Sequence, residues 1–302
     1  MRESVAAVVV TYNRKELLIR CVNGLLGQTH PVDRIYIIDN ASSDGTFELL
    51  ERLGLTNNPI IEYVRLPENT GGAGGFHEGL KLAHKSGFQW IWLMDDDGCP
   101  DADSLGNLLS KKNISDFLSP VVLCDDESLS FPFDLPRRRA AAYSLKDVNA
   151  HAIDGCIVGV AFPFNGTLVS SKMVDKVGYP KKEMFIWGDE LEYLARCKKA
   201  GFTPVTVCSA KHFHPPSRAK SAQLPFRLGW VTVPDDKFRL YLVVRNNSYI
   251  NSRYPSIGSL KFFVKYLMYA AFNITRAPVI VVGIYDGLLA NWKRARKLSK
   301  RF

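Results

Sequence analysis

The sequence predicts an α/β protein with a mostly parallel central sheet that is flanked by helices. The observations that support this prediction are the short apolar runs, the helical periodicity between them, and the size and hydrophobic content of the chain. Short continuous apolar runs such as residues 5–10 alternate with segments such as residues 15–26, whose apolar side chains recur at the spacing of one helix face. Continuous apolar runs are typical of strands that are covered on both faces. The chain has 302 residues, of which 46% are hydrophobic, so it can bury a sizeable core.

The individual elements follow from where the apolar runs and the helical periodicity begin and end. We expect strands over residues 5–10, 34–38, 60–66, 89–94, 117–123, 159–170 and 203–208. We expect helices over residues 15–26, 101–109, 171–177 and 189–200. A further helix should be capped by Ser43 or Asp44 and run through Leu53. Residues 125–149 show no sustained period and are expected to be irregular.

Residues 71–75 contain four glycines and follow the third expected strand. Glycine lets the backbone approach a ligand closely, and a helix over residues 76–86 would point its N-terminus at that ligand. The lysine of a P-loop is missing, which excludes that motif. The alternative is a flexible turn without a ligand.

Three adjacent carboxylates, Asp95, Asp96 and Asp97, follow the fourth expected strand. Like charges this close repel one another, and a divalent cation that carries phosphates would offset the repulsion. A solvated acidic turn is the alternative. Right-handed crossovers bring the carboxyl ends of parallel strands to one edge of a sheet, so we expect these carboxylates to lie near Thr11 and Asp39.

The composition narrows the class of partner. A net charge of +9 favours acidic partners such as nucleotide phosphates or an anionic membrane. The six cysteines include no C-x-x-C pair, which predicts neither a zinc site nor a disulfide framework. The N-terminus lacks the regions of a secretory signal, so we expect a cytoplasmic protein. No recognition helix, zinc pattern or RNA-binding signature predicts nucleic acid as a partner.

Four motifs occur in a characteristic order and spacing, and they are residues 10–14 (VTYNR), 38–46 (IDNASSDGT), 69–75 (NTGGAGG) and 95–97 (DDD). With these motifs the chain resembles the family 2 glycosyltransferases, which have the Rossmann-like GT-A fold. Within that family it is similar to the bacterial galactofuranosyltransferase and rhamnosyltransferase branch.

The resemblance implies an inverting, metal-dependent transferase of polysaccharide biosynthesis, such as O-antigen synthesis. It would move a sugar from a nucleotide-diphosphate donor, with UDP or dTDP as the nucleotide, to a hydroxyl of a cell-surface glycan or a lipid-linked acceptor. UDP-galactofuranose is the first expectation for the donor, and dTDP-rhamnose is the second. A nucleotidyltransferase is a more remote alternative, because such an enzyme would ordinarily show a basic phosphate-binding signature near its N-terminus.

The resemblance also implies which residues contact the donor and the metal. The expected donor-binding residues are Thr11, Tyr12, Arg14, Asp39, Arg65, Asn69, Gly72, Gly74, Asp95 and Asp96. The expected ligands of a divalent metal, Mn²⁺ or Mg²⁺, are Asp95, Asp97 and His214. Which of the three aspartates binds the ion stays open, and His212 is an alternative to His214. A neutral imidazole suits Mn²⁺ better than Mg²⁺.

The second acidic cluster, Asp189 and Glu190, should lie in the first turn of a helix, where carboxylates interact favourably with the helix dipole. The resemblance implies that Glu190 is the general base, with Asp189 as the alternative. Trp187 could stack on a sugar ring of the acceptor, and a buried tryptophan is the alternative. Arg245 belongs to an Arg-Asn-x-x-Tyr sequence and is expected to contact the acceptor or the diphosphate.

We expect a catalytic domain over residues 1–216 and a helical C-terminal extension over residues 217–302. In the extension, the apolar runs 260–272 and 279–285 are interrupted by Arg276 and Pro278, which argues against a membrane span. We expect an amphipathic helix pair and the basic tail, residues 293–301, to associate with the inner face of the cell membrane as a peripheral protein. Arg137–Arg139 are a further basic cluster that could meet diphosphate or lipid. For the C-terminal helices and tail, the alternative to membrane association is a helical lid or a dimer surface. The protein is therefore a possible homo-oligomer.

Overall fold

The computed structural model describes residues 2–131, 133–135, 140–142, 144–216, 220–225, 228–256 and 258–295. The chain divides into two compact units. Unit 1 comprises Met1–Lys182 and Arg196–Ser217, and unit 2 comprises Glu183–Ala195 and Arg218–Phe302. The domain boundary after residue 216 stays a prediction. The structure adds that the segment with Asp189 and Glu190 belongs to the same unit as the C-terminal helices.

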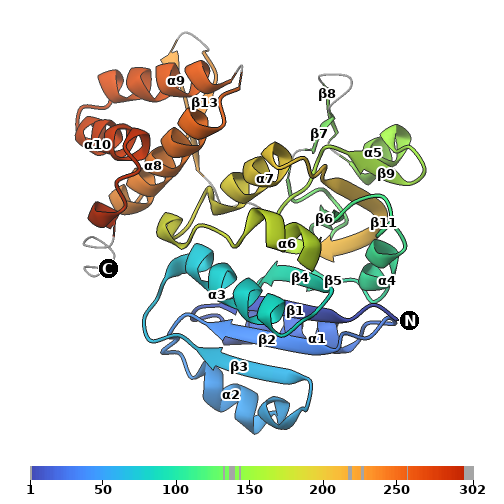
Figure 1. Ribbon diagram of the computed structural model, residues 1–302. Coiled ribbons are helices and arrows are strands. Elements are labelled where there is room, and N and C mark those ends of the chain that lie inside the picture. Colours follow the sequence, from blue (N-terminus) through green and yellow to red (C-terminus); the bar gives the residue numbers. More distant parts are fainter. Residues whose placement is uncertain are drawn as a thin grey trace. The chain divides into compact units, whose positions relative to one another are not determined.

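The elements of unit 1 alternate between strands and helices in the first half of the chain (Figure 1). The strands are β1 (Val5–Thr11), β2 (Arg34–Asp39), β3 (Ile61–Arg65), β4 (Trp90–Asp95), β5 (Cys99–Pro100), β6 (Phe117–Leu123), β7 (Phe133–Leu135), β8 (Ala140–Ala142), β9 (Cys156–Val158), β10 (Asn165–Ser170) and β11 (Val205–Phe213). The helices are α1 (Lys15–Leu26), α2 (Thr46–Arg52), α3 (Gly71–Lys85), α4 (Ser104–Leu109), α5 (Leu145–His151) and α6 (Ser171–Val177), with a 3₁₀ turn at Leu55–Asn57. A second 3₁₀ turn, Lys182–Met184, and helix α7 (Asp189–Lys199) have residues in both units.

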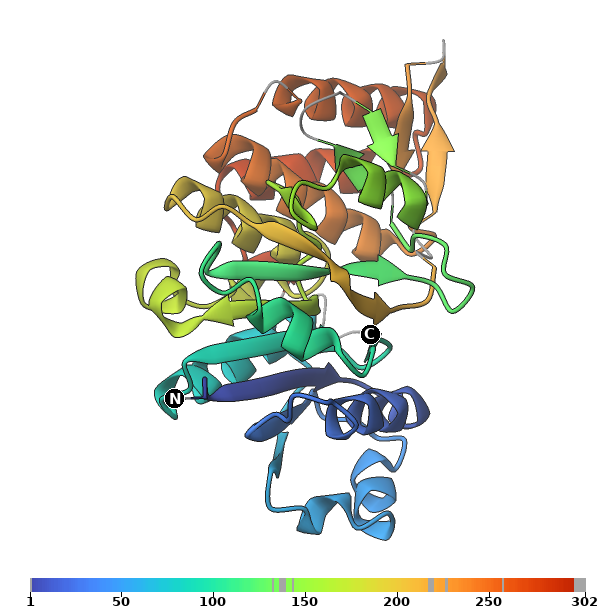
Figure 2. The ribbon, with the colours of Figure 1, turned by 90° about the vertical axis from the view of Figure 1, so that its right-hand side faces the viewer.

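The central sheet has the strand order β3-β2-β1-β4-β10-β6-β11-β5, and β9 pairs with β11. Strands β3, β2, β1 and β4 are mutually parallel, as expected for βαβ units. Strand β10 runs antiparallel to both β4 and β6, whereas β11 is parallel to β6. The predicted α/β fold is confirmed, and its sheet is mixed beyond β4. The first strands and helices, drawn in blue, stay together in both views (Figure 2).

Strand β1 lies inside the parallel part of the sheet, between β2 and β4, and every one of its side chains is buried. The buried residues of α1 are Leu18, Cys21, Val22 and Leu25, which share one helix face and pack in the same hydrophobic core. The sequence predicted the bounds of α1, β6 and α6 as the structure has them. These elements have strong periodicity and clear end signals.

Helix α3 begins at Gly71, so the glycine-rich segment is helical and the predicted loop is wrong. The glycines allow close contact between α3 and the sheet. A Cβ at Gly75 would lie 2.4 Å from Cγ1 of Val10, and one at Gly79 would lie 2.4 Å from Cγ1 of Val8. By contrast, a Cβ at Gly72 would meet nothing within 4 Å. Packing against β1 therefore outweighs the poor helix propensity of glycine.

Three further expectations were wrong in detail. The N-cap of α2 is Gly45, whose positive φ of 82° excludes most residues, while the Asp44 side chain bonds the hydroxyl of Thr46 instead. Residues 125–149 contain β7, β8 and α5, and Ser144 and Asp147 form a capping box at α5. Strand β11 continues to residue 213, beyond the predicted end at 208, because it pairs with β6 again after a register shift. Arg137–Arg139 lie outside the described residues.

Unit 2 is built on the helices α8 (Lys237–Arg253), α9 (Ser259–Phe272) and α10 (Ala277–Leu288), with a hairpin of β12 (Ser221–Gln223) and β13 (Trp230–Thr232). Its core contains side chains of all three helices and of the hairpin. Glycines again allow close packing, since a Cβ at Gly287 of α10 would lie 2.3 Å from the carbonyl oxygen of Arg245 in α8. Among the residues that the structure describes, no helix is both long and apolar enough to cross a membrane.

The contact between α3 and β1 can be tested with one chemical change at two positions. Gly79→Ala should lower the free energy of unfolding by about 1–3 kcal/mol more than Gly72→Ala, because only the first overpacks the core. Gly79 is in the helix interior, where alanine gains more helix propensity than it does at Gly72 in the first turn, so a lower stability of Gly79→Ala reports the packing. Thermal unfolding should give a midpoint that is lower by about 2–4 °C for each kcal/mol. Equal midpoints for the two variants would contradict this account.

Candidate functional site

The carboxyl ends of β1, β2, β3 and β4 meet at one edge of the sheet. Thr11 pairs with Asp39, Asp39 pairs with Arg65, and Val10 pairs with Asp95 in the strand register. The predicted convergence of these strand ends is therefore confirmed. Hydrogen bonds also tie the loops after β1 and β2 together, among them those from the Asn13 amide to Oγ of Ser42 (2.9 Å) and from Lys15 Nζ to the carbonyl of Asp44 (2.6 Å).

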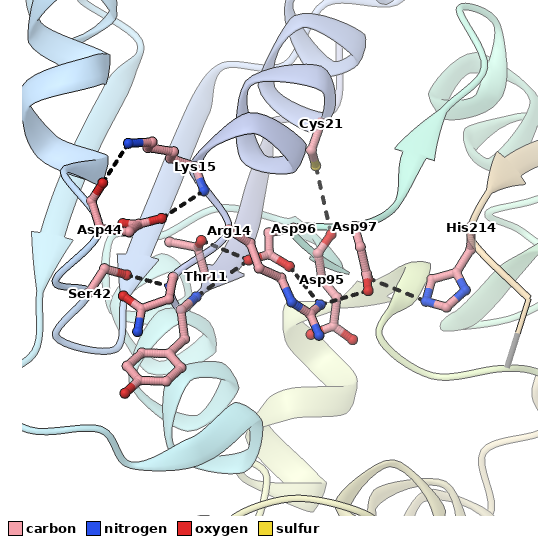
Figure 3. Close-up of polar contacts among 12 residues, drawn as sticks. Thr11, Arg14, Lys15, Cys21, Ser42, Asp44, Asp95, Asp96, Asp97 and His214 are labelled. Atoms are coloured by element: carbon pink, nitrogen blue, oxygen red, sulfur yellow. Dashed lines mark hydrogen bonds and ion pairs between the residues drawn. The ribbon is translucent and has the colours of Figure 1, made fainter. Parts of the chain in front are cut away.

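Asp96 is the buried member of the acidic cluster (Figure 3). Its carboxylate accepts hydrogen bonds from the hydroxyl of Thr11 (2.7 Å), from the amide of Tyr12 (3.4 Å) and from the guanidinium of Arg14 (3.2 Å). Burial raises the pKa of Asp96 to about 6, although the charge of Arg14 and the bond from Thr11 act in the opposite direction. The first loop of the chain is thus fixed to the acidic cluster by Asp96.

Asp97 lies between two basic groups. Nη1 of Arg14 donates to its Oδ2 at 2.6 Å, and Nε2 of His214 lies 3.3 Å from its Oδ1. Burial alone would raise the pKa of Asp97, but His214 and Arg14 outweigh it, and the pKa is lower than usual. Arg14 contacts both Asp96 and Asp97, so one exposed guanidinium balances much of the repulsion that the sequence predicted.

The ring of His214 is suited to bind a metal. Its Nδ1 lies 2.6 Å from the carbonyl oxygen of Pro215, and a carbonyl can only accept, so this nitrogen carries the proton of that bond. Nε2 therefore carries the second proton when the charged ring pairs with Asp97, and once that proton is lost its lone pair is free for a metal ion. This donor pair fits a divalent cation that takes its remaining ligands from substrate phosphate and water. Among the described residues, no group of three or more His, Cys, Asp or Glu side chains is placed to hold a metal ion, so the predicted set of Asp95, Asp97 and His214 is not assembled as a metal site in the structure.

His212 has a different environment from His214. It is fully buried in β11, and neither ring nitrogen has a hydrogen-bond partner in the described part of the chain. Gly98 and Gly166 make room for the ring, since a Cβ at Gly98 would lie 2.1 Å from its Nε2. Burial lowers the pKa of His212 to about 3, so the ring is neutral.

Asp39 and Arg65 surround the loop after β2. Asp39 is fully buried and accepts hydrogen bonds from the amide of Ser42 (2.9 Å) and from the hydroxyl of Tyr63. Nη2 of Arg65 donates to the carbonyl of Ser42 at 2.7 Å. Sequence reasoning missed Tyr63, although its pairing with Ile37 in the register of β2 and β3 brings it to this edge.

The start of α3 is fixed by two asparagines. Oδ1 of Asn69 accepts from the amide of Gly71 at 2.8 Å, and Asn40 bonds both the hydroxyl of Thr70 (2.9 Å) and the carbonyl of Gly71 (3.2 Å). Asn40 was also missed, although it follows Asp39 directly in the second motif. Of the predicted glycines, Gly74 packs against Thr70, and Gly72 has open space beside it.

The remaining predicted residues belong to unit 2. Oε2 of Glu190 accepts a hydrogen bond from the amide of Gly188 at 2.9 Å, and its side chain is partly exposed. Asp189 is buried, with an exposed fraction of 5%. Trp187 is partly buried and packs against the core of this unit, while Arg245 is fully buried.

The chain is similar in sequence to known glycosyltransferases. The model of glycosyl transferase family 2 matches residues 6–152. The chain is 31% identical to galactofuranosyltransferase GlfT1 of Mycolicibacterium smegmatis over 309 residues, which cover 99% of this chain and 97% of that protein.

Two solved structures have a similar fold. S. aureus TarS 1-349 in complex with UDP-GlcNAc has a TM-score of 0.58 at 13% identity, and the match covers 98% of this chain and 83% of that one. GalNAc-T7 with UDP, GalNAc and Mn²⁺ has a TM-score of 0.54 at 15% identity, and the match covers 90% of this chain and 58% of that one. The chain therefore belongs to glycosyltransferase family 2, and it is an enzyme of that family with the GT-A fold, related along nearly its whole length to galactofuranosyltransferases.

Proposed function

We propose that this glycosyltransferase is an inverting, metal-dependent enzyme that transfers galactofuranose from UDP-galactofuranose to a hydroxyl of a cell-surface glycan or a lipid-linked acceptor. The observation that carries the proposal is the cluster of Arg14, Asp96, Asp97 and His214 at the strand ends, in a chain 31% identical to a galactofuranosyltransferase. A dTDP-rhamnose donor would use the same cluster and is the alternative. Membership of the family argues against a nucleotidyltransferase.

The edge formed by β1, β2 and β3 is proposed to bind the nucleoside of the donor. The ring of Tyr12 is 44% exposed, so a base can stack on it. The exposed Arg65 is proposed to offer a donor for the base and the ribose, and Asp39, its fully buried partner in the register, is proposed to offer an acceptor, which requires its carboxylate to become accessible when the donor binds. Asn69 and the open space beside Gly72 at the start of α3 would face the sugar phosphates, where the helix N-terminus favours negative charge.

Asp95, Asp97 and His214 are the residues proposed to hold Mn²⁺ or Mg²⁺. When bound, the ion would neutralise the charge that develops on the departing diphosphate. Asp96 is proposed to act differently, because its oxygens already bind Thr11, Tyr12 and Arg14. It orients the loop after β1 and keeps the Arg14 guanidinium close to the phosphates.

Glu190 is proposed to take the proton of the acceptor hydroxyl. Its partial exposure supports this role over that of the buried Asp189. The acceptor oxygen then forms a bond to the anomeric carbon on the face opposite the diphosphate, while the bond from that carbon to the diphosphate oxygen breaks. UDP leaves, the proton stays on Glu190 until it passes to solvent, and the sugar is transferred with inversion.

A donor screen tests the proposed substrate and the metal together. UDP-galactofuranose with Mn²⁺ should raise the midpoint of thermal unfolding by several °C, since ligand at 100 times its Kd adds about 2.7 kcal/mol to the stability. EDTA or His214→Ala should remove most of this rise. His151→Ala, which changes a partly exposed histidine whose Nδ1 contacts the carbonyl of Asp147 in its own helix, is the matched control and should keep the rise. A larger rise with dTDP-rhamnose would contradict the proposed donor.

The role of Glu190 is tested by an isosteric change. Glu190→Gln should lower kcat for transfer by about 10²–10⁴-fold, because it removes the base, and should leave the Kd of UDP-galactofuranose within about twofold. Asp189→Asn is the matched control. Near-normal transfer by Glu190→Gln together with loss of transfer by Asp189→Asn would assign the base to Asp189.

We also propose that unit 2 associates peripherally with the inner face of an anionic membrane. Leu260, Val264 and Leu267 lie on one face of α9 and are 72%, 49% and 52% exposed. A second exposed stripe on α10 contains Val281, Tyr285 and Leu288, with Leu289 just beyond its end. Lys293 follows as an exposed basic residue and would gain about 1 kcal/mol near anionic lipid, whereas the exposed Arg294 already pairs with the buried Asp286 at 2.7 Å. Residues 296–301 of the basic tail lie outside the described residues.

Vesicle binding tests this surface. The protein should float with phosphatidylserine-containing vesicles at low salt, and less protein should float at high salt because surface charges are screened. Leu267→Glu should lower the bound fraction several-fold, since it places a charge in the apolar stripe. Leu53→Glu is the matched control, because Leu53 is 50% exposed and belongs to unit 1, and it should bind like the wild type. Equal binding by both variants, or no binding at low salt, would contradict the proposal.

A further inference from the structure

The segment before Glu190 has an unusual backbone. Phe185, Trp187 and Gly188 have φ values of 69°, 64° and 101°. The first two are bulky residues in the left-handed region, which is strained for L-residues other than glycine. Such a conformation persists only where the surroundings impose it. The residues that impose it here come from α8.

Asn246 and Arg245 hold this segment by its carbonyl groups. Nδ2 of Asn246 lies within hydrogen-bond distance of three carbonyl oxygens, those of Met184 (3.0 Å), Ile186 (3.0 Å) and Trp187 (2.7 Å). Nη2 of Arg245 donates to the carbonyls of Met184 (2.9 Å) and Glu183 (3.2 Å). Both side chains are fully buried.

The two α8 side chains also bond each other. Nε and Nη2 of Arg245 donate to Oδ1 of Asn246 at 2.9 and 2.7 Å, which leaves the Asn246 amino group to face the carbonyls. The guanidinium lies over the rings of Tyr241 and Trp292, at 5.5 and 4.8 Å from their centroids. Its Nη1 has no hydrogen-bond partner in the part of the chain that the structure describes. A buried guanidinium without a bonded carboxylate lowers stability, and the nearby carboxylate of Asp286, which accepts from the hydroxyl of Tyr241 at 2.9 Å, offsets part of this cost.

The held segment leads directly to the proposed base. The carbonyl of Trp187 accepts from Asn246, and the next amide, that of Gly188, donates to Oε2 of Glu190. Gly188 also packs closely on Asn246, since a Cβ at residue 188 would lie 3.1 Å from Cβ of Asn246. Asn246 therefore sets the direction of the Gly188 N–H, and this N–H sets the position of the Glu190 carboxylate.

We propose that Asn246, oriented by Arg245, is a positioning residue that holds the strained turn Glu183–Gly188 and thereby presents the Glu190 carboxylate to the acceptor hydroxyl. This inference rests on the proposed role of Glu190 as the base. It assigns Arg245 an indirect role in place of the acceptor contact that the sequence predicted, which the full burial of its side chain explains.

The test compares two asparagines of α8 in the full-length chain. Asn246→Ala should lower kcat with UDP-galactofuranose by at least about 10-fold, because the base is no longer positioned, and should change the KM and Kd of the donor by less than about twofold. Hydrogen exchange of a peptide that covers residues 183–190 should become faster. Asn251→Ala is the matched control, because Nδ2 of Asn251 bonds only the carbonyl of Asn247 in its own helix, and it should match the wild type in every measurement.

A second variant covers the case in which Asn246→Ala does not fold. Asn246→Asp keeps an acceptor for Arg245 but presents an oxygen to the three carbonyls, so it should also lose kcat and exchange protection. Unchanged kcat in a folded Asn246 variant, or a parallel loss of kcat and donor affinity, would overturn the proposal. If the wild type transfers no galactofuranose, the proposed function fails on its own. Unchanged exchange in residues 183–190 of an Asn246 variant would then refute the holding role separately.

Discussion

The charge balance around Arg14 is the interaction on which the site depends. Asp96 and Asp97 follow a strand whose preceding residues are fully or nearly fully buried, and repulsion between them is offset by one guanidinium that contacts both. The buried carboxylate of Asp96 accepts a hydrogen bond from the hydroxyl of Thr11, whereas the carboxylate of Asp97 faces His214. The two carboxylates are neighbours in sequence, yet the pKa of the first is raised and that of the second is lowered. Burial and partners, rather than residue type, separate their chemical roles.

The sheet and several helices could be predicted because their sequence patterns are local. The buried run of β1 and the one-sided periodicity of α1 identify these elements without knowledge of their neighbours. Parallel topology then implied that Thr11, Asp39 and Asp95 meet at one edge, which the register confirms. The antiparallel insertion of β10 could not be predicted in this way, because strand order depends on long-range pairing.

The errors arose where tertiary contacts override local preference. The glycines of α3 are poor helix formers, and the close fit of Gly75 against Val10 and of Gly79 against Val8 favours the helix there. The buried state of Arg245 was equally invisible, since a charged residue in a helix is usually exposed. The ring of Trp292 and the carbonyl partners of Arg245 come from segments that lie far from it in the sequence. Within unit 2, the proposed base Glu190 and the two side chains that position it, those of Asn246 and Arg245, therefore belong to one hydrogen-bonded network. No single sequence motif predicts this network.

The glycines of α3 have a consequence for divergence within the family. Positions 75 and 79 have no room for a side chain, whereas position 72 is sterically open. Relatives with the same helix-to-sheet distance can therefore vary at position 72 but not at the other two. A glycine kept at position 72 in relatives would reflect selection by a ligand, since packing does not require it. If a ligand does select glycine at position 72, the glycine-rich motif combines a packing constraint with a recognition constraint, and the pattern of accepted substitutions can separate them.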